Sequence, residues 1–192
     1  NTACTSTAGI CRLLQLRRVA FVASEKPEMS VSAKTNQVEA DMIAAMVERI
    51  FRQADRFDYS ATVGVIVPYR NQIATVRNAI DRYGIPALHS ITIDTVERFQ
   101  GSQRDYIIYG LTVQQRYQLN FLTDNVFEED GTLIDRKLNV AMTRARKHLT
   151  IVGNPDILAG SAVYRRLMDF MKSRDCYFNV ACEKFCAGDF SV

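Results

Sequence analysis

The feature that most constrains this chain is a repeated alternation between short apolar runs and longer segments with helical periodicity. The apolar runs are rich in β-branched residues and carry few charges, so each predicts a strand buried on both faces. Strands that alternate with helices form parallel sheets with right-handed crossovers, which predicts an α/β fold with helices on both faces of a parallel sheet. The predicted strands cover residues 18–23, 62–67, 90–94, 105–112 and 149–152.

Two helices can be placed between these runs from their end signals. Asn36 and Glu39 have the spacing of a capping box, and apolar residues continue from there at helical intervals. Pro68 ends the second apolar run, and the helix that follows is expected to close near Gly84.

The domain organisation follows from the length of the chain and from its polar stretches. A chain of 192 residues can bury one sizeable core, and we place the main domain at residues 17–172. Residues 1–16 and 173–192 are expected to be peripheral. Residues 114–135 are polar and contain turn residues, so we expect a long surface insertion. The acidic residues at its end would repel the phosphates of a nucleic acid, so we expect a protein contact or a solvated loop.

The composition limits the partners, the cell compartment and the cysteine chemistry that we expect for this chain. The chain has 24 basic and 21 acidic residues, too even a balance to indicate a polyanion partner by itself. There is no secretory signal and no apolar run of roughly 18 residues, so we expect a cytoplasmic protein without a membrane partner. The five cysteines include Cys176, Cys182 and Cys186, whose spacing matches no standard zinc pattern, and we interpret them as ordinary reduced thiols.

Ligands of open parallel sheets gather beyond the carboxyl ends of the strands, and three unusual segments are expected there. The first is VIVPYRNQ at residues 65–72, where a buried strand ends in a proline, an aromatic ring, an arginine and two amides. Such a strand end offers hydrogen-bond donors and a flat ring to a polynucleotide. A proline-terminated strand with an ordinary helix cap fits the same residues, and the local pattern does not decide between them.

The second segment is TVERFQGSQRD at residues 95–105, between two predicted strands. The Thr95 hydroxyl, the Gln100 amide and the close backbone approach that Gly101 permits suit contacts with phosphate or ribose at the edge of a nucleotide site. A Gln-Gly pair also occurs in ordinary turns, so this signal is weak alone. We expect Phe99 to be a core or hinge residue rather than a base-stacking ring.

The third segment is RKLNVAMTRARK at residues 136–147, which runs into the last predicted strand. At helical spacing its apolar residues share one arc and the opposite half is strongly cationic. A solvated basic face is the ordinary explanation for such a pattern. An arginine directed at a phosphoryl group is the sharper one, because a guanidinium contacts two phosphate oxygens at once. The cationic half carries Arg136, Asn139, Thr143, Arg144 and Arg146.

Motifs that the sequence lacks also limit its function. No GxxxxGK[ST] loop occurs, so the chain lacks the loop that cradles a triphosphate in P-loop NTPases. His89 and His148 are not accompanied by a GxSxG, HExxH or triad-like arrangement, and we interpret both as core or surface histidines.

In this order, the three segments resemble motifs IV, V and VI of superfamily 1 helicases, with the closest match to the Upf-like subgroup. The segment that resembles motif IV is VIVPYRNQ. The segment that resembles motif V is TVERFQGSQRDYII, and the one that resembles motif VI is LNVAMTRARKHLTIVGNP. The resemblance spans residues 17–172 and implies the second RecA-like domain of such a motor, with a RecA-like P-loop NTPase fold that lacks the P-loop itself. A preceding RecA-like domain, absent from this chain, would bind most of the ATP and Mg²⁺.

The resemblance also implies roles for single residues. Arg144 would be the catalytic arginine finger at the γ-phosphate, while Gln100, Gly101 and Gln103 would border the nucleotide. The residues near single-stranded DNA or RNA, or at the surface that couples it to ATP hydrolysis, would be Pro68, Tyr69, Thr95 and Thr143. By itself the chain is expected not to hydrolyse ATP.

Two departures from the family pattern leave a second interpretation open. Gln103 stands where members of the family usually carry glutamate, and residues 1–16 hold no counterpart of the second arginine of a YRM-like motif. The alternative is a non-enzymatic nucleic-acid-binding or scaffold domain with a degenerate motor fold. The intact LNVAMTRAR segment argues against it, because a scaffold has no use for an arginine at a γ-phosphate.

Overall fold

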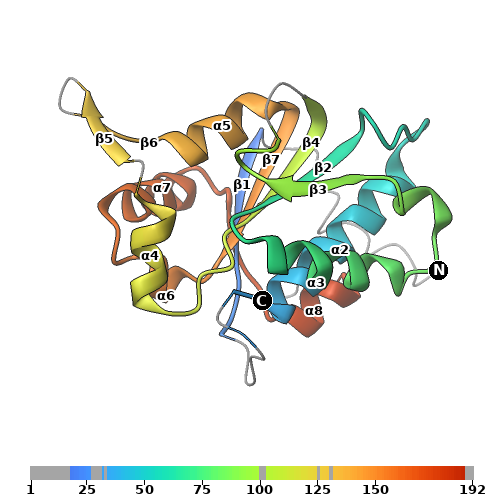
Figure 1. Ribbon diagram of the computed structural model, residues 1–192, viewed down its shortest axis with the longest axis horizontal. Helices are drawn as coiled ribbons and strands as arrows, with labels where there is room; N and C mark the ends of the chain where they lie inside the picture. Colours follow the sequence, from blue (N-terminus) through green and yellow to red (C-terminus); the bar gives the residue numbers. More distant parts are fainter. Residues whose placement is uncertain are drawn as a thin grey trace.

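A single sheet organises the fold of this protein. The computed structural model describes residues 18–26, 32, 34–99, 103–124, 126–129 and 132–188. The strands of the sheet, in chain order, are β1 (Val19–Ala23), β2 (Val63–Val67), β3 (Thr92–Thr95), β4 (Arg104–Gly110), β7 (Ala145–Gly153) and β8 (Tyr177–Asn179). They form a six-stranded sheet in the order β3-β2-β4-β7-β1-β8, and every neighbouring pair is parallel (Figure 1). The predicted parallel sheet is therefore confirmed.

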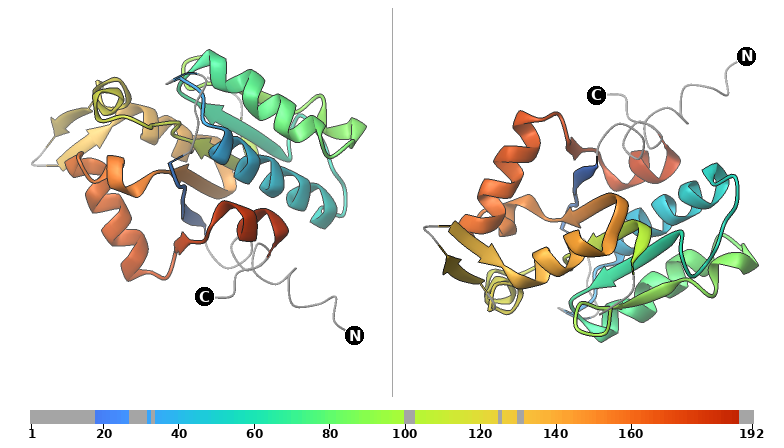
Figure 2. Two further views of the ribbon diagram at one scale, coloured as in Figure 1. Left: turned by 90° about the horizontal axis from the view of Figure 1, so that it is seen from below. Right: turned by 90° about the horizontal axis from the view of Figure 1, so that it is seen from above.

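Helices cover both faces of the sheet, as predicted. One face carries α2 (Gln37–Gln53), α3 (Arg70–Asp81) and α8 (Cys182–Ala187). The other face carries α4 (Arg116–Leu122), α5 (Arg136–Arg144), α6 (Pro155–Leu158) and α7 (Ala162–Ser173), and Figure 2 shows the two groups on opposite sides. A 3₁₀ turn, η1 (Pro86–Leu88), leads from α3 into β3. This layered arrangement is the one expected of a RecA-like domain.

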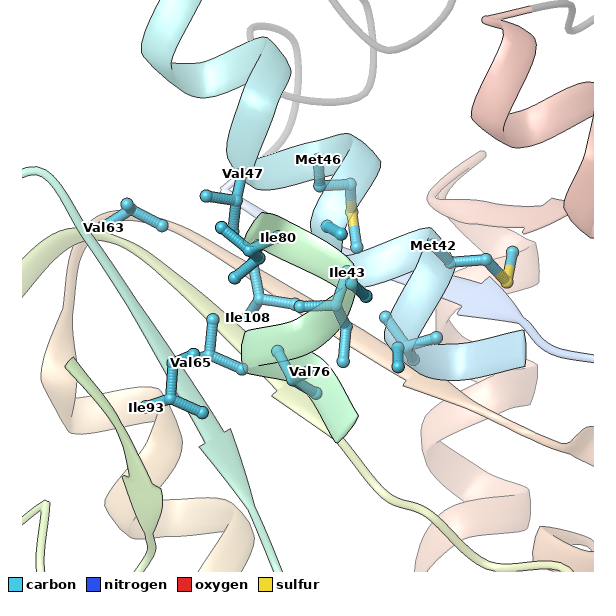
Figure 3. Close-up of a cluster of buried hydrophobic side chains, with 14 of the residues drawn as sticks. Met42, Ile43, Met46, Val47, Val63, Val65, Val76, Ile80, Ile93 and Ile108 are labelled. Carbon is cyan, nitrogen blue, oxygen red and sulfur yellow. The ribbon is translucent and has the colours of Figure 1, made fainter. Parts of the chain in front are cut away.

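Each face is held by its own apolar cluster. Under α2 and α3, side chains such as Ile43, Val47 and Ile80 pack against Val65 and Ile108 of the sheet (Figure 3). On the other face, residues including Tyr109, Ile151, Leu138 and Tyr164 form a second cluster. Because successive strand residues point to opposite faces, buried strands such as VGVIV feed both clusters at once.

The helix ends largely follow the predicted signals. Asn36 caps α2 by accepting a hydrogen bond from the Glu39 backbone at 3.1 Å, and its side-chain amide lies 3.3 Å from Glu39 Oε1. The backbone N–H of Asn36 donates to Gln72 Oε1 instead of to Glu39, so the reciprocal half of the capping box is replaced by a contact with α3. Gly84 closes the α3 region with a positive φ of 63°, which glycine adopts without strain.

The largest boundary error concerns the last long strand. Residues 145–147 were predicted to continue a helix, but α5 ends at Arg144 and β7 begins at Ala145. Arg104 of β4 pairs in register with Ala145, and Asp105 of β4 forms ion pairs with Arg146 and Lys147. The basic residues gave no local sign of a strand. The strand extends to Ala145 because β4, which lies far away in the sequence, pairs with it.

Residues 114–135 are more ordered than a surface insertion implies. They contain α4 and a two-stranded hairpin of β5 (Val126–Glu129) and β6 (Thr132–Asp135). Leu119 and Leu122 of α4 are buried in the second cluster, and buried Asp135 caps α5 by accepting from the Leu138 backbone at 3.0 Å. The hairpin projects away from the sheet (Figure 1).

The segment expected to be a peripheral carboxyl-terminal tail is likewise part of the packed domain. Strand β8 pairs with β1 at the edge of the sheet, and Phe185 of α8 is fully buried in the first cluster. The expected peripheral segment 1–16 lies outside the described residues. Across the described ranges, no helix is both long enough and apolar enough to cross a bilayer.

Candidate functional site

A groove lies beyond the carboxyl ends of β2 and β3. The register pairs Val67 with Thr95, so the residues that follow Val67 lie beside Thr95. An open cavity of about 440 Å³ results. Pro68, Tyr69 and Thr95, three of the four predicted nucleic-acid residues, meet here. The lining consists of Lys34, Pro68, Tyr69, Arg70, Asn71, Thr95, Glu97, Arg98 and Phe121.

A pair of stacked rings forms one wall of this groove. The rings of Tyr69 and Phe121 lie 5.1 Å apart between centroids, with planes 19° from parallel. Phe121 is 44% exposed, and the Lys137 ammonium lies 4.2 Å from its ring centroid and donates to its carbonyl oxygen at 2.7 Å. Sequence reasoning missed Phe121. The available signal was the spacing of Tyr117 and Phe121 on one helical turn within the presumed insertion.

The groove is also cationic. Lys34, Arg70 and Arg98 are exposed around it, with Glu97 as the acidic member. Within the described part of the chain, none of these three cations forms an ion pair. Exposed cations beside a flat ring are the surface that single-stranded nucleic acids require, because phosphates meet the charges and bases meet the ring.

A buried polar network lies behind the groove, with Glu39 as its centre. Its carboxyl group accepts from Thr112 N at 2.7 Å, from Ser24 Oγ at 3.2 Å and from Asn36 Nδ2 at 3.3 Å. These partners lie after β4, after β1 and at the start of α2, so one side chain ties three segments of the carboxyl edge together. Burial raises the pKa of Glu39 to about 8, against the opposing effect of the hydrogen bonds from Thr112 and Ser24.

The same network reaches the residues of the groove. Gln72, two residues after Arg70, exchanges two hydrogen bonds of 2.8 Å with the Asn36 backbone. The Gln118 side chain accepts from the backbone N–H groups of Gln114 and Gln115 at 3.0 and 2.9 Å. Burial raises the pKa of Tyr69, while a hydrogen bond from Gln118 lowers it. The position of Tyr69 is therefore supported by contacts on the side away from the groove.

Two of the residues predicted to face a nucleotide, Gln103 and Arg144, lie at the opposite edge of the sheet. Gln103 directly precedes β4 and Arg144 directly precedes β7, and the parallel register of Arg104 with Ala145 brings them to one edge. Gln103 Nε2 donates to the Thr143 carbonyl at 3.3 Å. Among the described residues, the buried Nε of Arg144 finds no hydrogen-bond partner. A guanidinium at this edge of the sheet can contact two oxygens of an anionic ligand such as a phosphate.

This placement corrects one expectation. The third segment does not lie beyond the carboxyl end of a strand, because α5 precedes β7 and its last turn meets the amino end of that strand. Thr143, predicted near nucleic acid or the coupling surface, does not line the groove; its hydroxyl donates to Val140 O at 2.9 Å, and its role stays a prediction. Gln100 and Gly101 lie outside the described residues.

Helix α5 spans the distance between the two edges. At its first turn Lys137 contacts Phe121 of the groove and pairs with Asp124 at 2.9 Å, and at its last turn it carries Thr143 and Arg144. Its 9 residues correspond to a length of about 13 Å.

In the described ranges, no cluster of acidic, histidine or cysteine side chains could hold a metal ion.

Phe99, expected to belong to the core, is 1% exposed and packs in the second cluster. The two histidines also fit their interpretation, since buried His148 contacts Thr150 Oγ1 at 2.9 Å and exposed His89 pairs with Asp81.

Comparison with known proteins identifies the chain's relatives. A family model described as an AAA domain matches residues 11–156. Helicase sen1 of Schizosaccharomyces pombe is 32% identical over 141 residues, which cover 72% of this chain and 8% of the relative. A regulator of nonsense transcripts 1 homolog of Arabidopsis thaliana is 30% identical over 162 residues, 81% of this chain and 12% of the relative. These relatives confirm the resemblance to Upf-like helicases.

The chain thus spans about a tenth of the length of these curated relatives. A solved C-terminal domain of a possible DNA helicase from Lactobacillus plantarum WCFS1 superposes with a TM-score of 0.41 at 15% identity, covering 84% of this chain and 94% of that one. The description of the fold therefore rests on the sheet topology rather than on that superposition.

Proposed function

This chain belongs to the AAA domain family, and from that premise we propose that it is the carboxyl-terminal motor domain of an ATP-dependent nucleic-acid helicase of superfamily 1. The observation that carries the proposal is the convergence of Pro68, Tyr69 and Thr95 with the ring of Phe121 in one cationic groove. A groove of this kind suits a single strand of DNA or RNA, held by backbone contacts and ring stacking without sequence readout.

The amino edge supplies the second half of the proposal. Arg144 would be the arginine finger, and Gln103 would border the nucleotide. The place of Arg144 at the end of α5, beside the contact between Gln103 and Thr143, supports this role, because a guanidinium there can contact two phosphate oxygens. ATP and Mg²⁺ supply the phosphoryl-transfer chemistry when bound, mainly by a preceding RecA-like domain that carries the P-loop.

Helix α5 would couple the two edges. A shift of Arg144 toward a phosphate would move the helix, and Lys137 at its other end touches Phe121. Packed helices move as units rather than deforming continuously, so a displacement at one end reaches the other. Closure of this domain onto its partner would thereby change the grip of the groove on the strand.

The remaining expectations belong to the same proposal. The motor domain would be residues 17–172 together with β8 and α8, which pack on it. The protein would act in the cytoplasm without a membrane partner. The acidic hairpin β5–β6 would contact protein or solvent rather than nucleic acid, since Glu128 is exposed on it.

ATP hydrolysis with and without single-stranded DNA and RNA tests the proposal. We expect none from this chain alone and stimulated hydrolysis from the complete gene product. Hydrolysis by this chain alone would refute the account of the nucleotide site. A complete product that binds nucleic acid but hydrolyses no ATP would instead favour a scaffold with a degenerate motor fold.

A further inference from the structure

A second cavity, remote in sequence from the groove motifs, lies where α8 rests against α2 and α3. It has a volume of about 370 Å³ and is lined by Asp41, Arg82, Tyr83, Cys182 and Cys186, among others. Figure 2 shows α8 alongside α2, to which Phe185 anchors it through the first apolar cluster. The helicase proposal gives this cavity no task.

The two cysteines of this cavity form a contacting pair. Their sulfur atoms lie 3.9 Å apart, one helical turn from each other on the inner side of α8. Both side chains are half-buried, so small reagents reach them through the cavity. Cys182 Sγ also lies 3.6 Å from the Val38 carbonyl in the first turn of α2.

The surroundings make the two thiols unequal. Contact with Cys182 lowers the pKa of Cys186, and the nearby Arg82 guanidinium acts in the same direction, while burial and Asp41 oppose them. The same contact and burial raise the pKa of Cys182. A thiolate is the reactive form of cysteine, and the Val38 carbonyl accepts from the Cys182 thiol. Cys182 therefore keeps its proton, and Cys186 is the nucleophile of the pair.

We propose that Cys182 and Cys186 form a redox modification site, at which a hydroperoxide oxidises Cys186 and a Cys182–Cys186 disulfide results. The Cys186 thiolate attacks one oxygen of the hydroperoxide, the O–O bond breaks, and the alkoxide leaves as an alcohol after taking up a proton. Cys186 is then a sulfenic acid. The Cys182 sulfur attacks the Cys186 sulfur, the S–S bond forms, the S–O bond breaks, and the hydroxide leaves as water with the proton of Cys182.

The reaction is balanced and the fold permits it. Two thiols and one hydroperoxide give one disulfide, one alcohol and one water, so the sulfurs lose two electrons and the peroxide gains them. The Cβ atoms of residues one turn apart lie roughly 5–6 Å from each other, whereas a disulfide needs roughly 3.5–4.5 Å, so α8 must unwind locally. Six residues make a marginal helix, and Gly188 closes it with a positive φ of 76°.

Cys176 offers an internal comparison. It is 6% exposed, belongs to the second apolar cluster and donates to the Arg174 carbonyl at 3.2 Å. We expect it to stay reduced under conditions that oxidise the pair.

The test treats the 192-residue chain with hydrogen peroxide and maps disulfides by mass spectrometry, with C176S in parallel to exclude a bridge to Cys176. We expect a loss of two hydrogens within one molecule, a bridge between Cys182 and Cys186, and full reversal by dithiothreitol. C182S retains a hydroxyl donor beside Cys186, so it should accumulate sulfenic acid on Cys186 that dimedone traps. C186S should label Cys182 about tenfold more slowly, because the thiolate fraction sets the rate.

Equal dimedone labelling of the two single variants would overturn the assignment of the nucleophile. Bridges that form only between molecules, or peroxide resistance equal to that of Cys176, would overturn the site itself. Neither result bears on the helicase proposal, which is tested by ATP hydrolysis.

Discussion

The two edges of the sheet differ in how completely this chain builds them. At the carboxyl edge, Tyr69 stacks on Phe121, and the Glu39 network fixes the segments behind the groove. At the amino edge, Arg104 donates to Thr92 Oγ1 and Asp105 pairs with Lys147, but Gln103 makes only a 3.3 Å bond to Thr143 among the described residues. The Nε of Arg144 has no partner in the described ranges. The groove is thus organised without a ligand, whereas the amino edge would be half of a site in the proposed motor.

This difference separates what each edge does in the proposed motor. A rigid groove loses little entropy when it binds a strand, so its residues should control affinity. An edge that another domain completes should control turnover, because its arginine meets the phosphate only after closure. Variants at the two edges should therefore fail in different ways.

The largest effect is expected from Arg144→Ala in the complete gene product. Turnover of ATP should fall by about 10³-fold or more, because an arginine finger stabilises charge that develops in the transition state. Single-strand affinity should remain as in the wild type. Steady-state hydrolysis and fluorescence anisotropy measure the two quantities.

Arg146→Ala is the matched control, because Arg146 lies in β7 and faces Asp105 rather than the open edge. Equal losses of turnover in both variants would remove the special role of Arg144. A loss of strand affinity in Arg144→Ala would erase the distinction between the edges.

The next effect concerns Glu39, whose pKa rises from 4.5 to about 8 on folding. A raised carboxyl pKa stabilises the fold fully below the unfolded value, and this contribution is lost as pH rises through the folded value. The free energy of unfolding should therefore fall between about pH 5 and pH 8, by up to about 1.4 kcal/mol per pH unit. Urea unfolding across this range measures the slope.

Glu39→Gln should flatten the slope, because an amide does not titrate. Ser24→Ala removes a hydrogen bond that favours the ionised form, so the slope should persist and extend to higher pH. An unchanged slope in Glu39→Gln would show that another group titrates.

A smaller effect is expected from Phe121→Ala. Loss of the ring that supports Tyr69 should lower single-strand affinity by about tenfold, since stacking contributes roughly 1–3 kcal/mol per base. Tyr117→Ala is the control, because Tyr117 lies on the same helix, is 67% exposed and does not line the groove. Binding isotherms that coincide for the two variants would rule out the ring pair as a binding wall.

The smallest effect is expected from Arg98→Ala. If Arg98 contacts one phosphate, the slope of log affinity against log salt should become shallower by about 0.7 for a single strand. Arg52→Ala, at the far end of α2 and paired with Glu48, should leave the slope unchanged. A salt series of binding measurements distinguishes them.

The sequence predicted the elements well where each carries its own signal. Apolar strands such as VGVIV are recognisable because both faces are buried, and Asn36 marks the start of α2 because its side chain satisfies a helix-end N–H. The motif order was also enough to identify the family. Predictions failed at Ala145 and at β8, where the strand exists because a distant neighbour pairs with it.

What the sequence by itself determined is the alternation of strands and helices and the chemistry available in the three segments. The tertiary structure alone decided which of these residues meet. Pro68, Tyr69 and Thr95 share a groove because β2 and β3 are neighbours in register, and Phe121 joins them from a segment with no motif. Arg144 and Thr143 lie at the opposite, amino edge of the sheet because α5 directly precedes β7. Such proximity depends on strand order and chain direction, which periodicity along one segment does not encode.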